Sequence, residues 1–306
     1  MRRDVFVGYL CLVAIWGLTW SAIKVGIAAV PPFVFAFERA LLVSVILTAF
    51  SFALRMPFPR RLPQLAAAAF AGLFNTGFSW AVIFWSEQYV PSGLVSVFGA
   101  TAPVWTAVLA HFLVRGDRMT AFKVLALTLG LGGTAVLVGA PEAGSGVEPL
   151  IATALLALLP ITWGFIAIFQ ARYLLREAPL PTVAVGAWAG ALVLAPFALT
   201  QTGMPQVWDG STALAFGYLV IFGSCVGLSL QLWLSRALRP TTMAFVQVII
   251  PTEALLVGAF ALGEAITWRM LAGAILVAAA VVVNAVAGGS GTTSPKAPFP
   301  SMTVSS

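Results

Sequence analysis

The sequence predicts an all-α integral membrane protein with ten transmembrane helices, and three observations support this prediction. The chain of 306 residues is 60% apolar and 8% charged, with a mean hydropathy of +1.01, whereas soluble domains carry about 25% charged residues. Apolar runs of about 20 residues, the length that crosses a bilayer, recur along the chain. Lysines and arginines cluster in every second gap between these runs. Because basic loops are retained in the cytoplasm, we expect both termini to be cytoplasmic.

Short gaps separate the apolar runs, and several of them contain prolines, which interrupt helices. The first five predicted spans cover residues 5–29, 32–54, 63–86, 91–114 and 120–140. The last five cover residues 147–171, 181–200, 211–235, 241–262 and 268–287. The remaining segment, 288–306, is rich in Gly, Ser and Pro, a composition that predicts a disordered cytoplasmic tail.

The distribution of charge orients these spans. Basic residues precede the first run and follow each even-numbered run, as at Arg2, Arg60, Arg118, Arg176 and Arg239. The other gaps carry mainly acids, and Arg269 is their basic exception. Nucleic-acid binding would require the basic residues to gather on one face, so the net charge of +6 indicates membrane topology and no nucleic-acid partner.

An internal repeat relates residues 1–140 to residues 147–287 at a spacing of 147 or 148. The matched positions are Trp16-Gly17 with Trp163-Gly164, Pro32 with Pro179, Pro103 with Pro251, Asp117 with Glu264, and Thr120 with Thr267. Each half contains five spans, an odd number, so the second half is predicted to be inverted in the membrane. Inverted repeats of this kind build many secondary transporters, which bind substrate near the membrane midplane between the halves.

Four segments also carry a family resemblance. They are AIWGLTWSAIKVG in the first span, FERALL in the second, YVPSGLVSVFGATAPVWTAVLAHFLVRGD around the fourth, and LRPTTMAFVQVIIPTEALLVGAFALGE around the ninth. With these segments the chain resembles the EamA family of the drug/metabolite transporter superfamily over about residues 5–287. The resemblance implies ten helices in two EamA repeats and transport of small metabolites such as amino acids, amines or nucleotide-related compounds. Aromatic amino acid exporters of the YddG type form one branch. Gly116-Asp117 departs from the Gly-Glu that the first repeat usually carries.

Polar and aromatic residues inside the predicted spans are candidates for lining a substrate cavity. Asn75 and Ser79 are four residues apart and therefore share one helix face, and several tryptophans lie deep in their spans. We predict a cavity lined by Trp16, Trp20, Asn75, Ser79, Trp80, Trp163, Gln231 and Gln247. Such amides and hydroxyls can bind a solute, but they also join packed helices through bonds worth about 1 kcal/mol. Both interpretations stay open.

Pro103 and Pro251 fall near the middle of the fourth and ninth predicted spans. Each lacks a backbone donor, which would free the carbonyl of Gly99 and of Gln247 respectively. A freed carbonyl is unfavourable in hydrocarbon, so each helix break is expected to face protein, water or substrate. Kinks for close helix packing are the alternative.

Charged residues inside the spans are the remaining candidates, since even mild scales assign a central charge a cost of about 3 kcal/mol. Lys24 and Glu38 lie at similar depths on the first two spans, which predicts an ion pair that acts as a gate or a structural clasp. Arg39 points to another side of the helix than Glu38. Glu253 follows Pro251 and is a candidate for pairing with Arg39 or for proton coupling.

Together these patterns predict a secondary transporter of the bacterial inner membrane and not an enzyme. Its substrate is expected to be an amino acid or a related amphipathic solute, exported by alternating access through a central cavity. The alternatives are another class of metabolite, namely nucleotide-related compounds, amines or sugars, or a passive channel. The sequence contains no phosphate-binding loop and no cluster of metal ligands, so neither a cofactor nor a metal is expected. The oligomeric state is not predicted.

Overall fold

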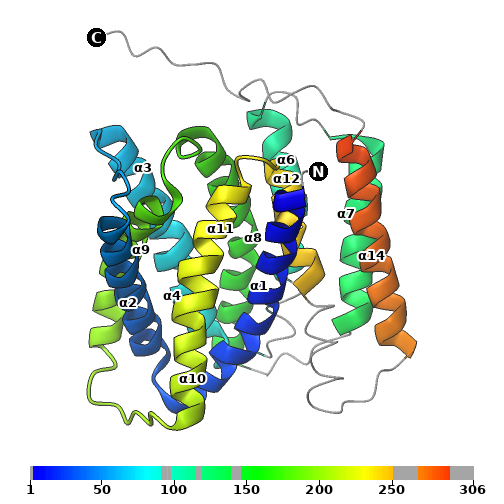
Figure 1. The fold of residues 1–306 in the computed structure, drawn as a ribbon. Coiled ribbons are helices and arrows are strands. Elements are labelled where there is room, and N and C mark those ends of the chain that lie inside the picture. Colours follow the sequence, from blue (N-terminus) through cyan, green and yellow to red (C-terminus); the bar gives the residue numbers. More distant parts are fainter. Residues whose placement is uncertain are drawn as a thin grey trace.

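The computed structural model describes residues 3–90, 95, 98–114, 119–138, 146–250 and 268–289. These residues form helices and connecting turns without a strand, which confirms the all-α prediction. The helices stand roughly side by side in a bundle, and the first residues of the chain lie at the same end as the last residues of the final helix (Figure 1).

The first half of the chain begins with α1 (Arg3–Ala29) and α2 (Pro32–Ala53), which are antiparallel. A third long segment comprises α3 (Leu62–Gly72), a π-helical stretch η1 (Leu73–Phe78) and α4 (Ser79–Ser86). Two shorter apolar helices follow, α6 (Ala102–Leu113) and α7 (Ala121–Val138).

The second half begins with α8 (Val147–Tyr173) and α9 (Pro179–Leu199). A third long segment again contains a π-helical stretch, as α10 (Gly210–Tyr218), η2 (Leu219–Val226) and α11 (Gly227–Leu234). The short α12 (Pro240–Ala244) and the apolar α14 (Trp268–Gly289) complete the described helices. α14 therefore extends through Gly289, which corrects the predicted start of the tail at residue 288.

Six of the described helical segments are long and apolar enough to cross a membrane: Arg3–Ala29, Pro32–Ala53, Leu62–Ser86, Val147–Tyr173, Pro179–Leu199 and Gly210–Leu234. They correspond to the first, second, third, sixth, seventh and eighth predicted spans. Shorter apolar helices lie in the fourth, fifth and tenth predicted spans. The complete count of ten spans and their orientation stay predictions. We call the end of the bundle where α1 ends and α2 begins the outer end, because the charge pattern predicts that it faces away from the cytoplasm.

Prolines determine where several of these helices start. α2, α3, α6, α9 and α12 all carry proline at the first or second position, where the missing amide has no intrahelical partner to lose. Pro103 is the second residue of α6 and follows a turn at Thr101. The helix is thus interrupted near the predicted place, whereas Pro251 lies outside the described residues.

Small residues allow a close helix contact, which joins α3 and η1 to α9. The positions of Gly186 and Gly190 in α9 form a Gly-x-x-x-Gly pattern, a common device for close backbone approach in membranes. Gly72 lies against the backbone of Gly186, and Gly190 lies against Thr76 and Gly77. A side chain at Gly72 would overlap the α9 backbone, so glycine is required there.

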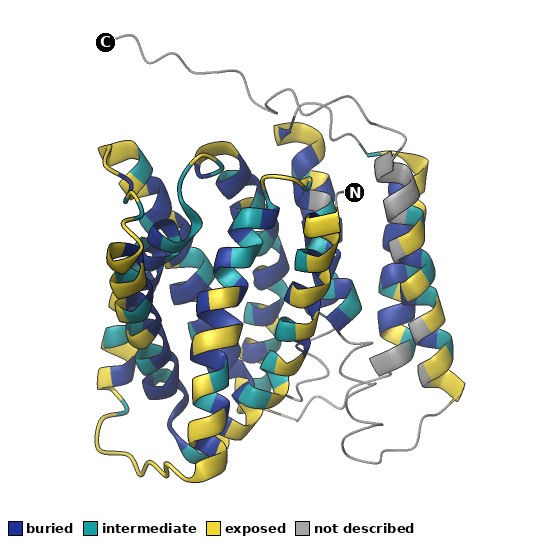
Figure 2. Ribbon diagram, viewed as in Figure 1, coloured by how far each residue is buried: buried dark blue, intermediate teal, exposed yellow. Residues whose placement is uncertain are grey.

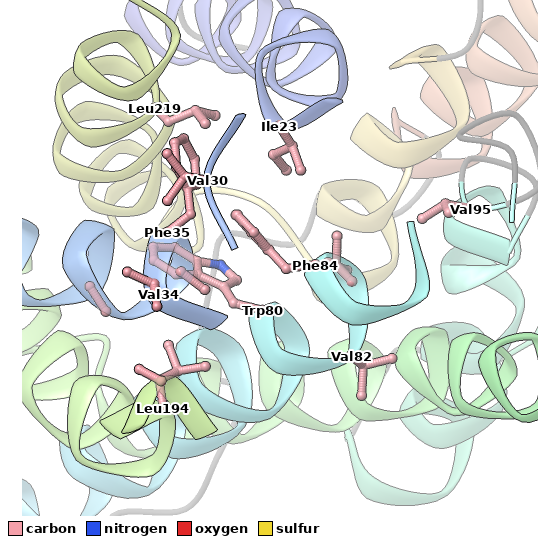
Figure 3. Packing of buried hydrophobic residues seen from close by; sticks show 14 of the residues in the cluster. Ile23, Val30, Val34, Phe35, Trp80, Val82, Phe84, Val95, Leu194 and Leu219 are labelled. Carbon is pink, nitrogen blue, oxygen red and sulfur yellow. The ribbon is translucent and has the colours of Figure 1, made fainter. Parts of the chain in front are cut away.

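The largest cluster of buried apolar residues lies toward the outer half of the bundle, and Figure 3 shows its packing. It joins α1, α2, α4, α8, α9 and η2, with Phe35 and Phe84 fully buried among its members. Lipid-facing positions account for the many exposed apolar residues on the outside of the bundle (Figure 2). Three of its members, Ile23, Ile83 and Phe84, also line the central cavity described next.

Candidate functional site

A central cavity lies among the helices, with walls from α1, α2, η1, α4, α6, α8, η2, α11 and α12 and from the residues that follow α12. It holds about 1040 Å³ of space not occupied by atoms, part of it open to solvent.

The structure brings all eight predicted lining residues to this cavity. They are Trp16, Trp20, Asn75, Ser79, Trp80, Trp163, Gln231 and Gln247. Arg39, one of the charged residues inside the predicted spans and a candidate for gating or coupling, also lines it. The wall therefore combines several indole rings, several amides and one guanidinium group.

The two π-helical stretches shape the middle of the cavity. A serine hydroxyl within η2 and another directly after η1 each donate a hydrogen bond to the carbonyl five residues earlier, Ser224 to Leu219 and Ser79 to Phe74, both at 2.8 Å. π-helical turns are rare and often occur at functional sites. Here they turn Asn75 and Gly223 toward the cavity.

Arg39 is the cation of the cavity wall, and its side chain is only 3% exposed. Its Nε donates a hydrogen bond to Oγ of Ser224 at 3.0 Å. Its guanidinium carbon lies 4.0 Å from the centroid of the Trp80 ring, a cation–π arrangement. The hydrogen bond from η2 and the ring from α4 together fix the direction of the guanidinium.

Two indoles of the wall are held by hydrogen bonds from one half of the chain to the other. Nε1 of Trp163 donates to Oγ of Ser79 at 3.0 Å, and Nε1 of Trp16 donates to the carbonyl of Gly223 at 3.2 Å. Both residues line the cavity, and these two bonds fix the positions of their rings.

Three polar residues of the wall, Thr19, Thr106 and Gln170, are absent from the predicted set. Thr19 follows Trp16 by three residues and Gln170 follows Trp163 by seven, so both lie on the same helix face as a predicted tryptophan. That spacing is a signal that could have identified them. Thr106 is brought in because α6 packs closely on Gly164 of α8, a contact that the sequence pattern does not reveal.

The predicted ion pair between Lys24 and Glu38 is wrong for this structure. Glu38 is half-buried and lies beside Trp208 and Phe216 on the apolar side of α2. The carboxylate on which Lys24 acts is instead that of Glu87, at the end of α4. Similar depth on consecutive helices is not enough to predict an ion pair, because the two side chains point to different sides of the bundle. Glu253 lies outside the described residues, so its pairing with Arg39 stays a prediction.

Comparison with known proteins identifies the family. The sequence profile described as the EamA-like transporter family matches the chain twice, at residues 5–139 and 150–286. The chain belongs to this family. EamA-like proteins are transporters, so this chain is a membrane transporter, in agreement with the multi-pass helical structure and with the resemblance found in the sequence.

Similar EamA proteins support this assignment along almost the whole chain. The uncharacterized transporter YoaV of Bacillus subtilis is 24% identical and covers 92% of this chain, with 96% of its own length matched. The uncharacterized inner membrane transporter YedA of Escherichia coli K12 is 26% identical, over 91% of this chain and 90% of its own. A Salmonella typhimurium protein called a probable amino-acid metabolite efflux pump is also 26% identical, over 92% and 95%. The chain is thus a multi-pass protein of the bacterial inner membrane.

One solved crystal structure has the same fold. It superposes with a TM-score of 0.76 at 20% sequence identity, and the match covers 96% of this chain and 100% of the other. This likeness concerns the fold alone.

Proposed function

We propose that the protein is a secondary transporter that exports a small amphipathic solute, an amino acid or a related metabolite. The solute binds in the central cavity, and two inverted five-helix repeats, residues 1–140 and 147–287, move against each other to give alternating access. Two copies of the family profile and a π-helical stretch in the third long segment of each half support this arrangement.

The observation that carries the proposal is the composition of the cavity wall. Indole faces from Trp16, Trp20 and Trp163 suit an apolar or aromatic portion of a solute, and Asn75, Gln231 and Gln247 offer hydrogen bonds to its polar end. Ligand sites typically combine a mainly apolar wall with a few polar groups that orient the ligand. The name of the Salmonella relative supports the same class of solute.

The cavity also differs at its two ends, as a carrier requires. Toward the outer end, Ile23, Ile83 and Phe84 line it and belong to the buried apolar cluster. Toward the opposite end, Gln170 and Gln231 line it and also border a smaller pocket between α3, α8, α9 and α11. This arrangement supports a conformation that is closed at the outer end, with the polar path leading inward.

Counterflow in proteoliposomes tests the proposal. Vesicles loaded with unlabelled phenylalanine, tryptophan or threonine are expected to accumulate the labelled amino acid transiently, which a passive channel does not do. Asn75→Ala and Gln231→Ala each remove a hydrogen bond worth on the order of 1 to 2 kcal/mol, which would raise the half-saturating concentration roughly five- to thirty-fold. Gln206→Ala, which removes an exposed amide outside the cavity, serves as the matched control and should change nothing.

Counterflow of nucleosides, amines or sugars instead of amino acids would assign a different substrate class. If Asn75→Ala and Gln231→Ala had the same half-saturating concentration as wild type, the solute would not bind in this cavity.

A further inference from the structure

Arg39 is held as a preformed receptor on the cavity wall. Only Nε has a hydrogen-bond partner among the described residues, Ser224, and the guanidinium carbon lies over the Trp80 ring. Gly223 makes room for the terminal amino groups, since a Cβ at that position would lie 3.2 Å from Nη2. The end of the fork that arginine uses for two-pronged hydrogen bonding therefore has space beside it.

The charge of Arg39 is not balanced within the described chain. None of the described carboxylates lies within ion-pair distance of it, and the titratable group that acts on it is the thiol of Cys225. A buried charge without a counterion is strongly unfavourable, and intramembrane charges generally mark a substrate or ion path. A bound anion can supply this counterion, and Glu253, which lies outside the described residues, is the alternative that the sequence predicts.

We propose that Arg39 anchors a carboxylate group of the transported solute. This inference rests on the proposed function, because it assigns one chemical group of the solute to one residue of the same cavity. Of the anions that a guanidinium binds by two parallel hydrogen bonds, a carboxylate suits a wall otherwise made of indoles and amides, which cannot neutralise the additional charge of a phosphate. The remaining polar end of the solute then faces Asn75 and Gln247, and its apolar portion faces Trp20 and Trp163.

Paired solutes that differ in one group test this assignment. Counterflow is measured with phenylalanine, with phenethylamine, which lacks the carboxylate, and with 3-phenylpropionate, which lacks the amine. Wild type is expected to exchange the two carboxylates and to exclude phenethylamine. Arg39→Lys, which keeps the charge but loses the fork, should raise the half-saturating concentration at least tenfold for both carboxylates. Arg60→Lys, which makes the same change at an exposed position outside the cavity, is the matched control and should leave both values unchanged.

Two additional variants keep the test informative if Arg39→Lys does not fold. Ser224→Ala removes the partner of Nε and Gly223→Ala crowds Nη2, so each should weaken carboxylate binding while leaving Arg39 in place. Exchange of phenethylamine at the wild-type rate of phenylalanine, or unchanged carboxylate affinity in all three variants, would overturn the anchor while leaving a working carrier. No counterflow of any solute would overturn the proposed function itself and the anchor with it.

Glu87 supports a second inference from a different observation. It directly follows the last residue of α4, and its backbone amide donates to the carbonyl of Ile83 at 3.0 Å, which places it one turn beyond the cavity wall. Its side chain is 2% exposed, and neither carboxylate oxygen has a hydrogen-bond partner in the described part of the chain. A buried carboxylate without donors is strongly disfavoured in its charged form.

The charged groups near Glu87 do not compensate for this burial. Burial raises the pKa of Glu87, and Lys24 of α1 lowers it only in part. On α2, Arg39 faces Trp80 and Glu38 faces the opposite, apolar side. The outer half of α8 contributes apolar residues such as Leu156 and Leu159, and its Glu148 is exposed.

We also propose that Glu87 is a proton-binding site that is occupied while the outer end is closed. Opening that end would bring water and Lys24 to the carboxylate, which then releases its proton. Closing the outer end during transport would therefore take up one proton. The inference rests on the proposed function only for its effect on transport, since the proton itself can be measured without a solute.

Infrared titration of the protein in liposomes provides that measurement. The carbonyl stretch of a protonated carboxyl group is expected at neutral pH, to disappear at alkaline pH, and to be missing in Glu87→Gln. In counterflow, Glu87→Gln should keep exchange at neutral pH but lose the dependence of the rate on outer pH. Glu148→Gln, which changes an exposed carboxylate outside the cavity, should behave as wild type. The same band in Glu87→Gln, or an unchanged pH profile, would overturn this proton site without affecting the carrier function.

Discussion

The indole nitrogen of Trp16 donates a hydrogen bond to the backbone carbonyl of Gly223, 3.2 Å away, so the first helix is tied to the π-helical stretch of the opposite half. Trp163, the matched tryptophan of the second half, donates to Ser79 at the start of α4, directly after the other π-helical stretch. Each half thus fixes the irregular helix of the other at the cavity wall. The reciprocal bonds explain why a Trp-Gly pair recurs in the sequence at the start of both halves.

Removing either of these two indole hydrogen bonds is predicted to lower the stability by a similar amount. Trp16→Phe and Trp163→Phe each keep an aromatic ring but remove one hydrogen bond, and each should lower the free energy of unfolding by about 1 kcal/mol. Thermal unfolding in detergent measures this as a lower Tm. Trp268→Phe is the control, because this residue is 80% exposed and should leave Tm unchanged. Equal Tm values for all three variants would mean that the indole bonds contribute nothing.

The contact between Gly72 and Gly186 predicts a larger effect. A Cβ at Gly72 would overlap the backbone of α9, so Gly72→Ala must separate α3 from α9. We expect a destabilisation on the order of 2 to 3 kcal/mol, as for other overpacked sites. Gly217→Ala is the matched control, since nothing lies within 4 Å of a Cβ there and alanine should stabilise that helix by up to about 1 kcal/mol. If both variants changed the unfolding free energy relative to wild type in the same direction, the close contact would be contradicted.

The cavity wall could be predicted largely from the sequence, because polar and aromatic residues are conspicuous inside apolar helices. Asn75 and Gln247 have little reason to be in a lipid-facing position, so their presence alone identified an internal surface. The directions of individual side chains could not be predicted in the same way. A π-helical stretch adds a residue to one turn and rotates everything after it, so the face on which Ser224 meets Arg39 does not follow from regular helical spacing.

The burial of Glu87 could not be predicted from the sequence either. By its position between two apolar runs it is expected in an aqueous gap, where a carboxylate needs no partner. Its burial depends on how the chain closes over the end of α4, which is a tertiary contact without a local pattern. For the same reason the sequence assigned Lys24 to the wrong acid.

Asp209 predicts a dependence of stability on pH. It caps the N-terminus of α10 by accepting hydrogen bonds from the backbone amide of Thr212 at 2.7 Å and from the hydroxyl of Ser211 at 2.8 Å. These bonds lower the pKa of its carboxyl group, the amide of Thr212 most of all. A lowered pKa means that the cap stabilises the fold fully above the ordinary Asp value of about 3.9. The stabilisation is lost as the pH falls through the lowered value.

Asp209→Ala should therefore lower Tm at neutral pH and have little effect in strong acid, where the wild-type carboxyl is already protonated. Thermal unfolding of both proteins over a pH series measures the difference. Curves that stay parallel down to the most acidic sample would show that the carboxylate form of Asp209 contributes no stability.

The predicted orientation in the membrane can be tested by labelling single cysteines. Both native cysteines, Cys11 and Cys225, are first replaced by alanine. Gly203→Cys then places a thiol in the turn after α9, at the outer end. Arg60→Cys places one between α2 and α3, at the opposite end. Because basic loops stay in the cytoplasm, a membrane-impermeant maleimide added to intact cells should label position 203 and leave position 60 unlabelled. Permeabilisation should make both positions reactive, which controls for accessibility. Labelling of position 60 alone in intact cells would reverse the orientation and place the closed end of the cavity toward the cytoplasm.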